Sequence, residues 1–95
     1  MITMQLKKIK RNKIDIRRID WKIVKRLVTS LYYHSRMKKT QIATTCNLSY
    51  DKCRRYLCWM EIMDLINKDK NEEGFELIRL TEKGNDLYNK EFKEN

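Results

Sequence analysis

Apolar residues recur at helical spacing within residues 40–66, and they predict two helices separated by a short break. Four residues of the second helix follow the i, i+3, i+4, i+7 pattern and share one face: Cys53, Tyr56, Leu57 and Met60. Ser49 is its candidate N-cap, because a serine hydroxyl can accept a hydrogen bond from a first-turn N–H group. Thr40 is the corresponding candidate for the shorter first helix. Two helices joined by so short a turn are typical of a helix-turn-helix motif.

A longer apolar stripe precedes this motif and predicts a helix that begins at Asp15 or Asp20 and ends near His34. Its members keep helical spacing: Ile16, Ile19, Ile23, Leu27 and Leu31. His34 is the only histidine of the chain, and an imidazole at a helix C-terminus commonly just complements the helix dipole. Residues 35–39 would then form a loop or a one-bridge strand.

From residue 65 on, the pattern alternates and is interrupted by a turn at 71–74, which predicts a β hairpin. Ile78 and Leu80 lie on one face, whereas Phe75 and Leu77 point the other way. A hairpin with apolar groups on both faces needs extra cover, from the N-terminal segment or from a second subunit. The turn carries two glutamates, so we do not expect its tip to enter a DNA groove.

The last helix is expected to begin after Thr81, its candidate N-cap, and to end near Lys93. Gly84 lies in its first turn, where glycine costs roughly 1 kcal/mol relative to alanine and therefore suggests close packing. Tyr88 can complete the core. Phe92, four residues later, would extend an apolar ridge beyond what one small domain needs. Together with the outer face of the hairpin, this ridge predicts a homodimer.

Length and composition narrow the classes of protein. Ninety-five residues make one domain, with no room for a catalytic cleft between two lobes. The formal net charge of +9 indicates a polyanionic partner, with nucleic acid ahead of an anionic membrane surface. Segments 1–19 and 20–61 each carry +6, whereas segment 62–95 carries −3. No apolar run approaches the roughly 18 residues of a membrane span, so we expect a cytoplasmic, nucleoid-associated protein without membrane contact.

Residues 1–14 form a basic N-terminal arm ahead of a domain expected over residues 15–95. Five cations crowd a segment with little apolar content: Lys7, Lys8, Lys10, Arg11 and Lys13. The arm either follows DNA phosphates, adding affinity that salt weakens, or is a solvated terminus, and residues 1–6 alternate loosely enough to pair as a strand instead. Salt titrations with and without residues 1–14 would separate the two, because only a phosphate-contacting arm contributes to the salt slope.

Two groups of residues are candidate DNA contacts. The first surrounds the start of the shorter helix, where cations and free backbone N–H groups favour a phosphate: Lys38, Lys39, Thr40 and Gln41. The second occupies the first two turns of the longer helix, which normally reach base edges: Ser49, Tyr50, Lys52, Arg54 and Arg55. Arg54 and Arg55 are the best candidates for base readout, because a guanidinium can bind guanine O6 and N7 together. The alternative is that both arginines contact only phosphates.

No pattern in the sequence indicates catalysis or a bound metal. There is no glycine-rich phosphate loop and no nucleophile beside a base, so no catalytic residue, cofactor or small-molecule ligand is predicted. Cys46, Cys53 and Cys58 contain no C-x-x-C pair, and Cys53 and Cys58 face roughly 140° apart on one helix. We expect Cys46 and Cys53 in the core. Cys58 is expected on the outer face, where an intermolecular disulfide is the less favoured alternative.

Four short motifs carry a family resemblance: NLSY at 47–50, YL at 56–57, LI at 65–66 and LTEKG at 80–84. They resemble archaeal winged helix-turn-helix transcriptional regulators and a related archaeal chromosomal DNA-binding protein family, over about residues 18–92. The resemblance implies homodimers that bind double-stranded DNA through the second helix of the motif. Two features depart from the family: Asp64 stands where a glycine usually ends that helix, and the last helix is too short for the long coiled coil of the chromosomal proteins.

These patterns together predict a mainly α fold with a small β hairpin, a winged helix-turn-helix in the order helix, short strand, helix, helix, strand, strand, helix. The predicted function is double-stranded DNA binding, sequence-specific or architectural, as a transcriptional regulator. The alternative is a winged helix that serves as a protein-interaction module in a transcription or replication assembly. The basic helix favours the first function and the acidic hairpin turn keeps the second open, so a salt-dependent shift of duplex DNA would separate them.

Overall fold

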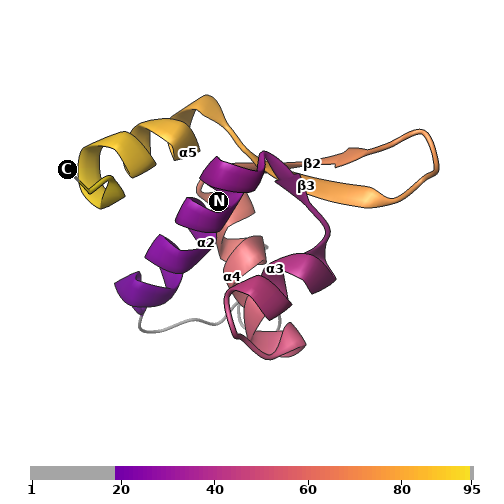
Figure 1. Cartoon of the computed structure of the whole chain (residues 1–95), viewed down its shortest axis with the longest axis horizontal. Helices are drawn as coiled ribbons and strands as arrows, with labels where there is room; N and C mark the ends of the chain where they lie inside the picture. The colour runs from indigo at the N-terminus through magenta and orange to yellow at the C-terminus, as the bar shows by residue number, and fades with distance from the viewer. Residues whose placement is uncertain (1–18, 95) are drawn as a thin grey trace, which may run out of the picture.

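Helices and strands follow one another in the order that the sequence predicts (Figure 1). The computed structural model describes residues 19–94, so the basic arm and the alternative helix start at Asp15 lie outside the described residues. The elements are α2 (Trp21–His34), β1 (Arg36–Met37), α3 (Lys39–Thr45), α4 (Tyr50–Ile62), β2 (Ile66–Lys70), β3 (Glu76–Leu80), α5 (Glu82–Leu87) and the π-helix η1 (Tyr88–Phe92). The predicted winged helix-turn-helix is confirmed.

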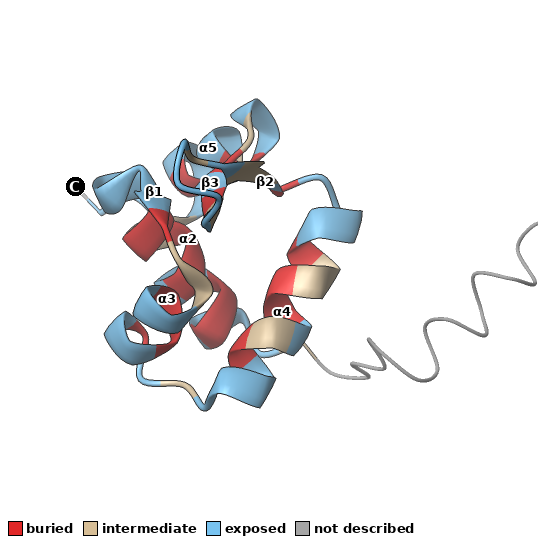
Figure 2. Cartoon of the chain, turned by 90° about the vertical axis from the view of Figure 1, so that its right-hand side faces the viewer, coloured by how far each residue is buried: buried red, intermediate tan, exposed pale blue. Residues whose placement is uncertain are grey.

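Helix α2 supplies much of the core. It begins after Asp20, one of the two predicted starts, whose carboxylate accepts a hydrogen bond from the Lys22 N–H at 3.0 Å. Figure 2 shows that the buried residues of α2 and α4 lie on the inward sides of these helices. The most deeply buried side chains come from helices and sheet alike: Val24, Leu27, Val28, Leu31, Ile42, Cys53, Leu57, Met60, Ile66 and Ile78. A single hydrophobic core therefore joins the helices and the sheet.

The three strands form an antiparallel sheet in the order β1-β3-β2. Residues 36–37 are therefore the short strand that the sequence left as an alternative to a loop, with Met37 opposite Ile78 of β3. The hairpin of β2 and β3 extends away from the helices on the right of Figure 1, as a wing. Its inward face is buried at Ile78 and Leu80, whereas Phe75 is 48% exposed. The two faces of the hairpin thus differ as the alternation predicts.

The junction between α4, β2 and α5 is closely packed. Asp64 adopts a left-handed conformation with φ of 64°, as expected where the family usually has glycine. Thr81 then holds the junction together, since its hydroxyl donates to the Asp64 carbonyl at 2.7 Å and accepts from the Gly84 N–H at 3.0 Å. A Cβ atom on Gly84 would lie only 2.3 Å from the Leu65 carbonyl oxygen. The close packing predicted at Gly84 is confirmed, and its partner is the start of β2.

The C-terminal helix corrects one prediction. It changes from α5 into the π-helix η1, with the Lys93 N–H donating to the Tyr88 carbonyl at 2.8 Å. Tyr88 is buried and stacks on Tyr32 with 4.0 Å between ring centroids, while Phe92 packs against Trp21. The prediction that Tyr88 completes the core is confirmed, whereas the outward ridge expected from Phe92 is wrong. Both aromatic rings face α2, because the helical spacing of the two residues does not say which side of the helix they occupy.

Gly84→Ala is expected to lower the free energy of unfolding by about 2–3 kcal/mol, because the added methyl group meets a backbone oxygen that cannot rotate away. Urea denaturation measures this loss. Gly74→Ala is the control: Gly74 has φ of 90° but no atom within 4 Å of an added Cβ, so only backbone strain of roughly 1 kcal/mol remains. Equal losses in the two variants would contradict the close contact between α5 and Leu65.

Candidate nucleic-acid interface

The orientation of α4 is determined by its buried side. Cys53, Tyr56, Leu57 and Met60 are all buried, as their spacing predicts. The Tyr56 hydroxyl also accepts a hydrogen bond from the Asp20 N–H at 3.0 Å, which ties α4 to the start of α2. Burial of apolar side chains contributes roughly 1.5–3 kcal/mol each, so rotation of α4 about its axis would cost several kcal/mol. The opposite side of α4 is therefore held toward solvent.

The start of α4 is capped as predicted. The Ser49 hydroxyl accepts a hydrogen bond from the Lys52 N–H at 3.1 Å, and Asp51 lies in the first turn, where the helix dipole favours negative charge. Tyr50 is half exposed beside the cap. The first two turns of α4 are thus well defined, with Ser49, Tyr50, Lys52 and the two arginines on the part of the helix that faces away from the core.

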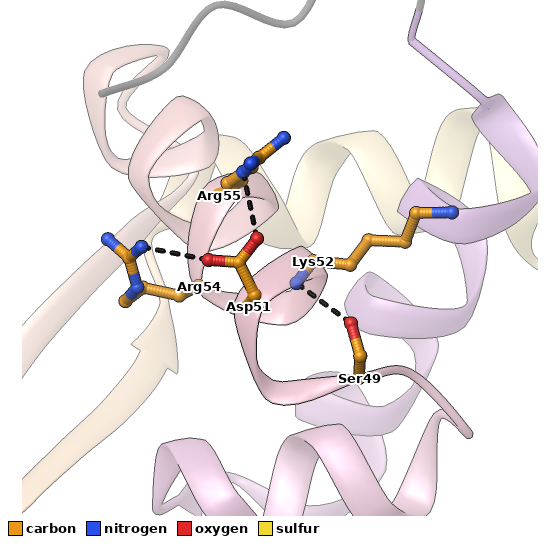
Figure 3. Close-up of polar contacts among 5 residues, drawn as sticks. All are labelled: Ser49, Asp51, Lys52, Arg54 and Arg55. Atoms are coloured by element: carbon orange, nitrogen blue, oxygen red, sulfur yellow. Dashed lines mark hydrogen bonds and ion pairs between the residues drawn. The ribbon is translucent and has the colours of Figure 1, made fainter. Parts of the chain in front are cut away.

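Asp51 lies between the two arginines predicted to read bases (Figure 3). One carboxylate oxygen accepts a hydrogen bond from Arg54 Nη2 at 3.0 Å, and the other forms an ion pair with Arg55 Nε at 3.1 Å. Both arginines remain substantially exposed, so each pair contributes only about 0.2–1 kcal/mol in water. The side chain of Lys52 extends away from this group in Figure 3. Asp51 was not among the residues predicted to contact DNA, although its i+3 and i+4 spacing to the two arginines indicates these contacts.

The start of α3 differs from the prediction in its cap. Thr40 is not the N-cap, because α3 begins at Lys39 and Lys38 occupies the cap position. Gln41 supplies the missing acceptor: its side-chain oxygen accepts from the Lys38 N–H at 2.9 Å. Thr40 and Gln41 are exposed on the first turn of α3. All four residues predicted here as phosphate contacts therefore surround one helix start.

Two of these cations contact the wing close to its turn. Lys39 forms an ion pair with Glu76 of β3 at 3.3 Å, and the Lys38 ammonium lies 4.0 Å from the centroid of the Phe75 ring. These contacts hold the lysine side chains beside β3. Part of their positive charge is not neutralised, because the single carboxylate, Glu76, pairs with Lys39 and Lys38 contacts only an aromatic ring. The start of α3 and the turn-side end of β3 thus form one surface.

The two groups of candidate contacts are neighbours in space. Cys53 Sγ of α4 lies 4.0 Å from the Lys39 carbonyl oxygen, so the second turn of α4 packs against the start of α3. Five cations gather on these two helix starts, and two carboxylates, Asp51 and Glu76, oppose them, which leaves a net charge of +3. Such a concentration of positive charge on adjoining helix starts attracts a polyanion.

A groove beside α3 extends this surface. It has a volume of about 510 Å³ and runs between α3 and the end of α2, where its polar lining includes His34, Arg36, Thr40, Gln41 and Thr44. Arg36 was not among the predicted contacts, and His34 was expected only to complement the dipole at the end of α2. Their closeness in the sequence to Lys38 and Lys39 was the available signal. Arg26 also supports α3, since its guanidinium donates to the Cys46 carbonyl at 2.7 Å.

The turn of the wing is acidic and exposed. Asn71 stabilises the turn, because its side-chain oxygen accepts hydrogen bonds from the N–H groups of Glu73 and Phe75. Glu72 and Glu73 both point into solvent at the end of the hairpin. The expectation that this tip avoids a DNA groove follows from the charge of these two glutamates.

The cysteines of the described residues behave as core groups. Cys46 and Cys53 are buried, and burial raises the pKa of Cys53 to about 11 and also raises the pKa of Cys46. A thiol with a raised pKa is a poor metal ligand. Cys58 is only half-buried on the outer part of α4. Residues 19–94 contain no group of three or more potential metal ligands and no helix long and apolar enough to cross a membrane.

Comparisons with known proteins agree with this architecture. The fold and the paired helices define a winged helix-turn-helix domain, and residues 17–94 match the winged helix-turn-helix family, so the chain belongs to that family. A solved structure of similar fold is a MarR family transcriptional regulator from Silicibacter pomeroyi DSS, with a TM-score of 0.65 and 20% sequence identity. The match covers 67% of this chain and 44% of that one, so it spans less than half of that protein's length. No curated protein matches this chain in sequence.

Proposed function

We propose that this chain binds double-stranded DNA, with the first two turns of α4 directed into the major groove and the start of α3 on the adjoining phosphates. The observation that carries this proposal is the position of the cations: Lys52, Arg54 and Arg55 occupy the side of α4 that the core leaves exposed. Membership of the winged helix-turn-helix family supports it. The proposed role is transcriptional regulation, as the name of the MarR family neighbour suggests, or DNA architecture.

The chemistry of the exposed side chains determines which part of the DNA each would contact. Arg55 and Arg54 carry guanidinium groups that can donate two hydrogen bonds to guanine, and they would read bases. Lys38 and Lys39 carry point charges beside exposed N–H groups of α3, and they would bind phosphates together with Thr40 and Gln41. The acidic wing turn would remain outside the grooves. Protection of bases next to Glu72 and Glu73 in footprinting would contradict this position of the wing turn.

Arg55→Ala is expected to weaken binding to a selected DNA site by about 1–3 kcal/mol while changing random-sequence binding much less, because the lost contacts are to bases. Lys39→Ala should weaken both alike, because phosphates are present in every sequence. Fluorescence anisotropy with a selected and a shuffled duplex measures both effects.

Lys83→Ala provides the control for these variants, since it removes an exposed cation from α5, away from the proposed interface. Lys83→Ala should leave the affinities for the selected and the shuffled duplex nearly unchanged, apart from the small general effect of removing one positive charge. An equal loss on both duplexes in Arg55→Ala would assign Arg55 to phosphate contacts. If the unaltered chain bound no duplex in a salt-dependent manner, DNA binding would be refuted and a role as a protein-interaction module would be favoured.

We also propose a homodimer, through a surface different from the one that the sequence suggested. Tyr88 is internal, and Phe75 is partly covered by the Lys38 ammonium. Another group of exposed apolar side chains, Trp21, Ile62 and Met63, lies around the half-buried Trp59, and we call these four residues the tryptophan patch. Trp21 lies 6.2 Å from Trp59 between ring centroids, and Ile62 and Met63 follow Trp59 by three and four residues at the end of α4.

The tryptophan patch includes side chains that are 54% exposed at Trp21 and 62% exposed at Ile62, which is unusual for a small domain. A two-fold axis through it would pair the patch with itself, as in most homodimers. Such a dimer would favour a palindromic DNA site, with recognition helices about 34 Å apart. The resemblance of the sequence motifs to those of archaeal regulators stays a prediction about the relationships of this chain. The source organisms of closer relatives would test it.

Sedimentation equilibrium at high micromolar concentration should give about twice the monomer mass of 11.7 kDa. Ile62→Glu should convert the dimer into a monomer, because it places a charge in the tryptophan patch. Phe75→Glu is the matched control at an exposed apolar residue of the wing. A monomer for the unaltered chain would refute the dimer. Dissociation by Phe75→Glu alone would move the interface to the hairpin.

A further inference from the structure

The Asp51 carboxylate is an unusual component of a surface proposed to bind DNA. It lies in the first two turns of α4, at the centre of the cations, and each of its oxygens contacts a different arginine, Arg54 at 3.0 Å and Arg55 at 3.1 Å (Figure 3). A carboxylate at this place lowers the attraction of the surface for every phosphate. If charge attraction alone governed binding, Asp51 would only weaken it.

The contact with Asp51 leaves the useful end of Arg55 accessible. The ion pair uses Arg55 Nε, and among residues 19–94 no hydrogen bond or ion pair involves its Nη1 or Nη2 groups. These two terminal groups can donate side by side to guanine O6 and N7. Because Asp51 restrains the guanidinium from its Nε side, less side-chain freedom is lost when the terminal groups bind a base. The pair therefore presents Arg55 end-on.

The same carboxylate discriminates between the two kinds of DNA contact. An arginine that leaves Asp51 for a phosphate loses an ion pair and brings two anionic groups close together. When Arg55 binds the neutral guanine edge end-on, it keeps its Nε beside Asp51 and adds no anion. Asp51 thus penalises phosphate contacts by Arg55 more than it penalises base contacts, whereas Arg54, which contacts Asp51 through Nη2, loses its ion pair in either case.

A first-turn carboxylate also stabilises its own helix through the dipole, and this effect must be separated from the effect on the arginines. The chain offers a matched residue for that purpose. Glu82 is the exposed first-turn carboxylate of α5, next to the N-cap Thr81 as Asp51 is near the N-cap Ser49. Within the described residues Glu82 forms no ion pair. Neutralising either residue changes the net charge equally.

We propose that Asp51 is a specificity-determining residue of the DNA interface, which holds Arg55 for guanine and restrains both arginines from phosphates. This inference rests on the proposed function, because it assigns a role within the same DNA-binding surface. It predicts that Asp51 lowers affinity for arbitrary DNA while maintaining affinity for the preferred site.

The test compares Asp51→Asn with Glu82→Gln on two duplexes: one selected by the unaltered chain from a random pool, and a shuffled duplex of the same base composition. Asp51→Asn should bind the shuffled duplex about three- to tenfold more tightly and steepen its salt slope by about 1, as a freed arginine meets a phosphate. Its ratio of selected to shuffled affinity should fall about tenfold. Glu82→Gln should leave that ratio unchanged.

A double-mutant cycle with Arg55→Ala separates positioning from direct contact. If Asp51 acts through Arg55, then Asp51→Asn should no longer reduce the ratio in the Arg55→Ala background. Asp51→Glu retains the charge and should bind the shuffled duplex as weakly as the unaltered chain does. Thermal melting of every variant checks that it is folded.

The outcomes distinguish the inference from the function on which it rests. Equal ratios for Asp51→Asn and Glu82→Gln, or an unaltered chain that selects no sequence, would overturn the role of Asp51 and leave DNA binding intact. A reduced ratio that persists in the Arg55→Ala background would overturn its action through Arg55. Absence of binding to both duplexes by the unaltered chain would instead refute DNA binding itself.

Discussion

Burial of one side of α4 is the constraint on which the rest of the structure depends. Cys53, Leu57 and Met60 pack into the core, and Tyr56 adds a hydrogen bond to the start of α2. A turn of α4 by a single residue, about 100°, would replace apolar groups in the core with charged ones. The positions of the exposed arginines are therefore a consequence of packing on the opposite side of the same helix.

The same helix also determines where the wing begins. Asp64, two residues after the end of α4, has a left-handed conformation, and the chain then enters β2 at Ile66. Gly84 admits the Leu65 carbonyl at a distance that a side chain would prevent, and Thr81 bonds to the Asp64 carbonyl. The end of α4, the start of β2 and the start of α5 are consequently joined by direct contacts. Wing residues Phe75 and Glu76 in turn contact the lysines at the start of α3.

Much of the fold could be predicted from local patterns, because caps and apolar spacing are properties of neighbouring residues. Asp20, Ser49 and Thr81 all cap helices as their side chains suggest. The cap of α3 could not be read in this way, since Gln41 reaches back to Lys38 and replaces the hydroxyl expected from Thr40. The inward direction of Phe92 also depends on tertiary packing, which periodicity does not contain. The ion pairs of Asp51 with the two arginines could have been predicted from the i+3 and i+4 spacing. Only the structure shows that both pairs form at the same time.

The most direct test of the account is the map of amide chemical shifts in labelled protein titrated with duplex DNA. Binding through the two helix starts predicts the largest changes at residues 38–41 and 49–55, with small changes at the wing turn 71–74 and at α5. These changes should diminish as salt is added, because phosphate contacts release counterions. Changes concentrated at the wing turn or on the tryptophan patch, or no changes at low salt, would contradict a DNA interface formed by α3 and α4.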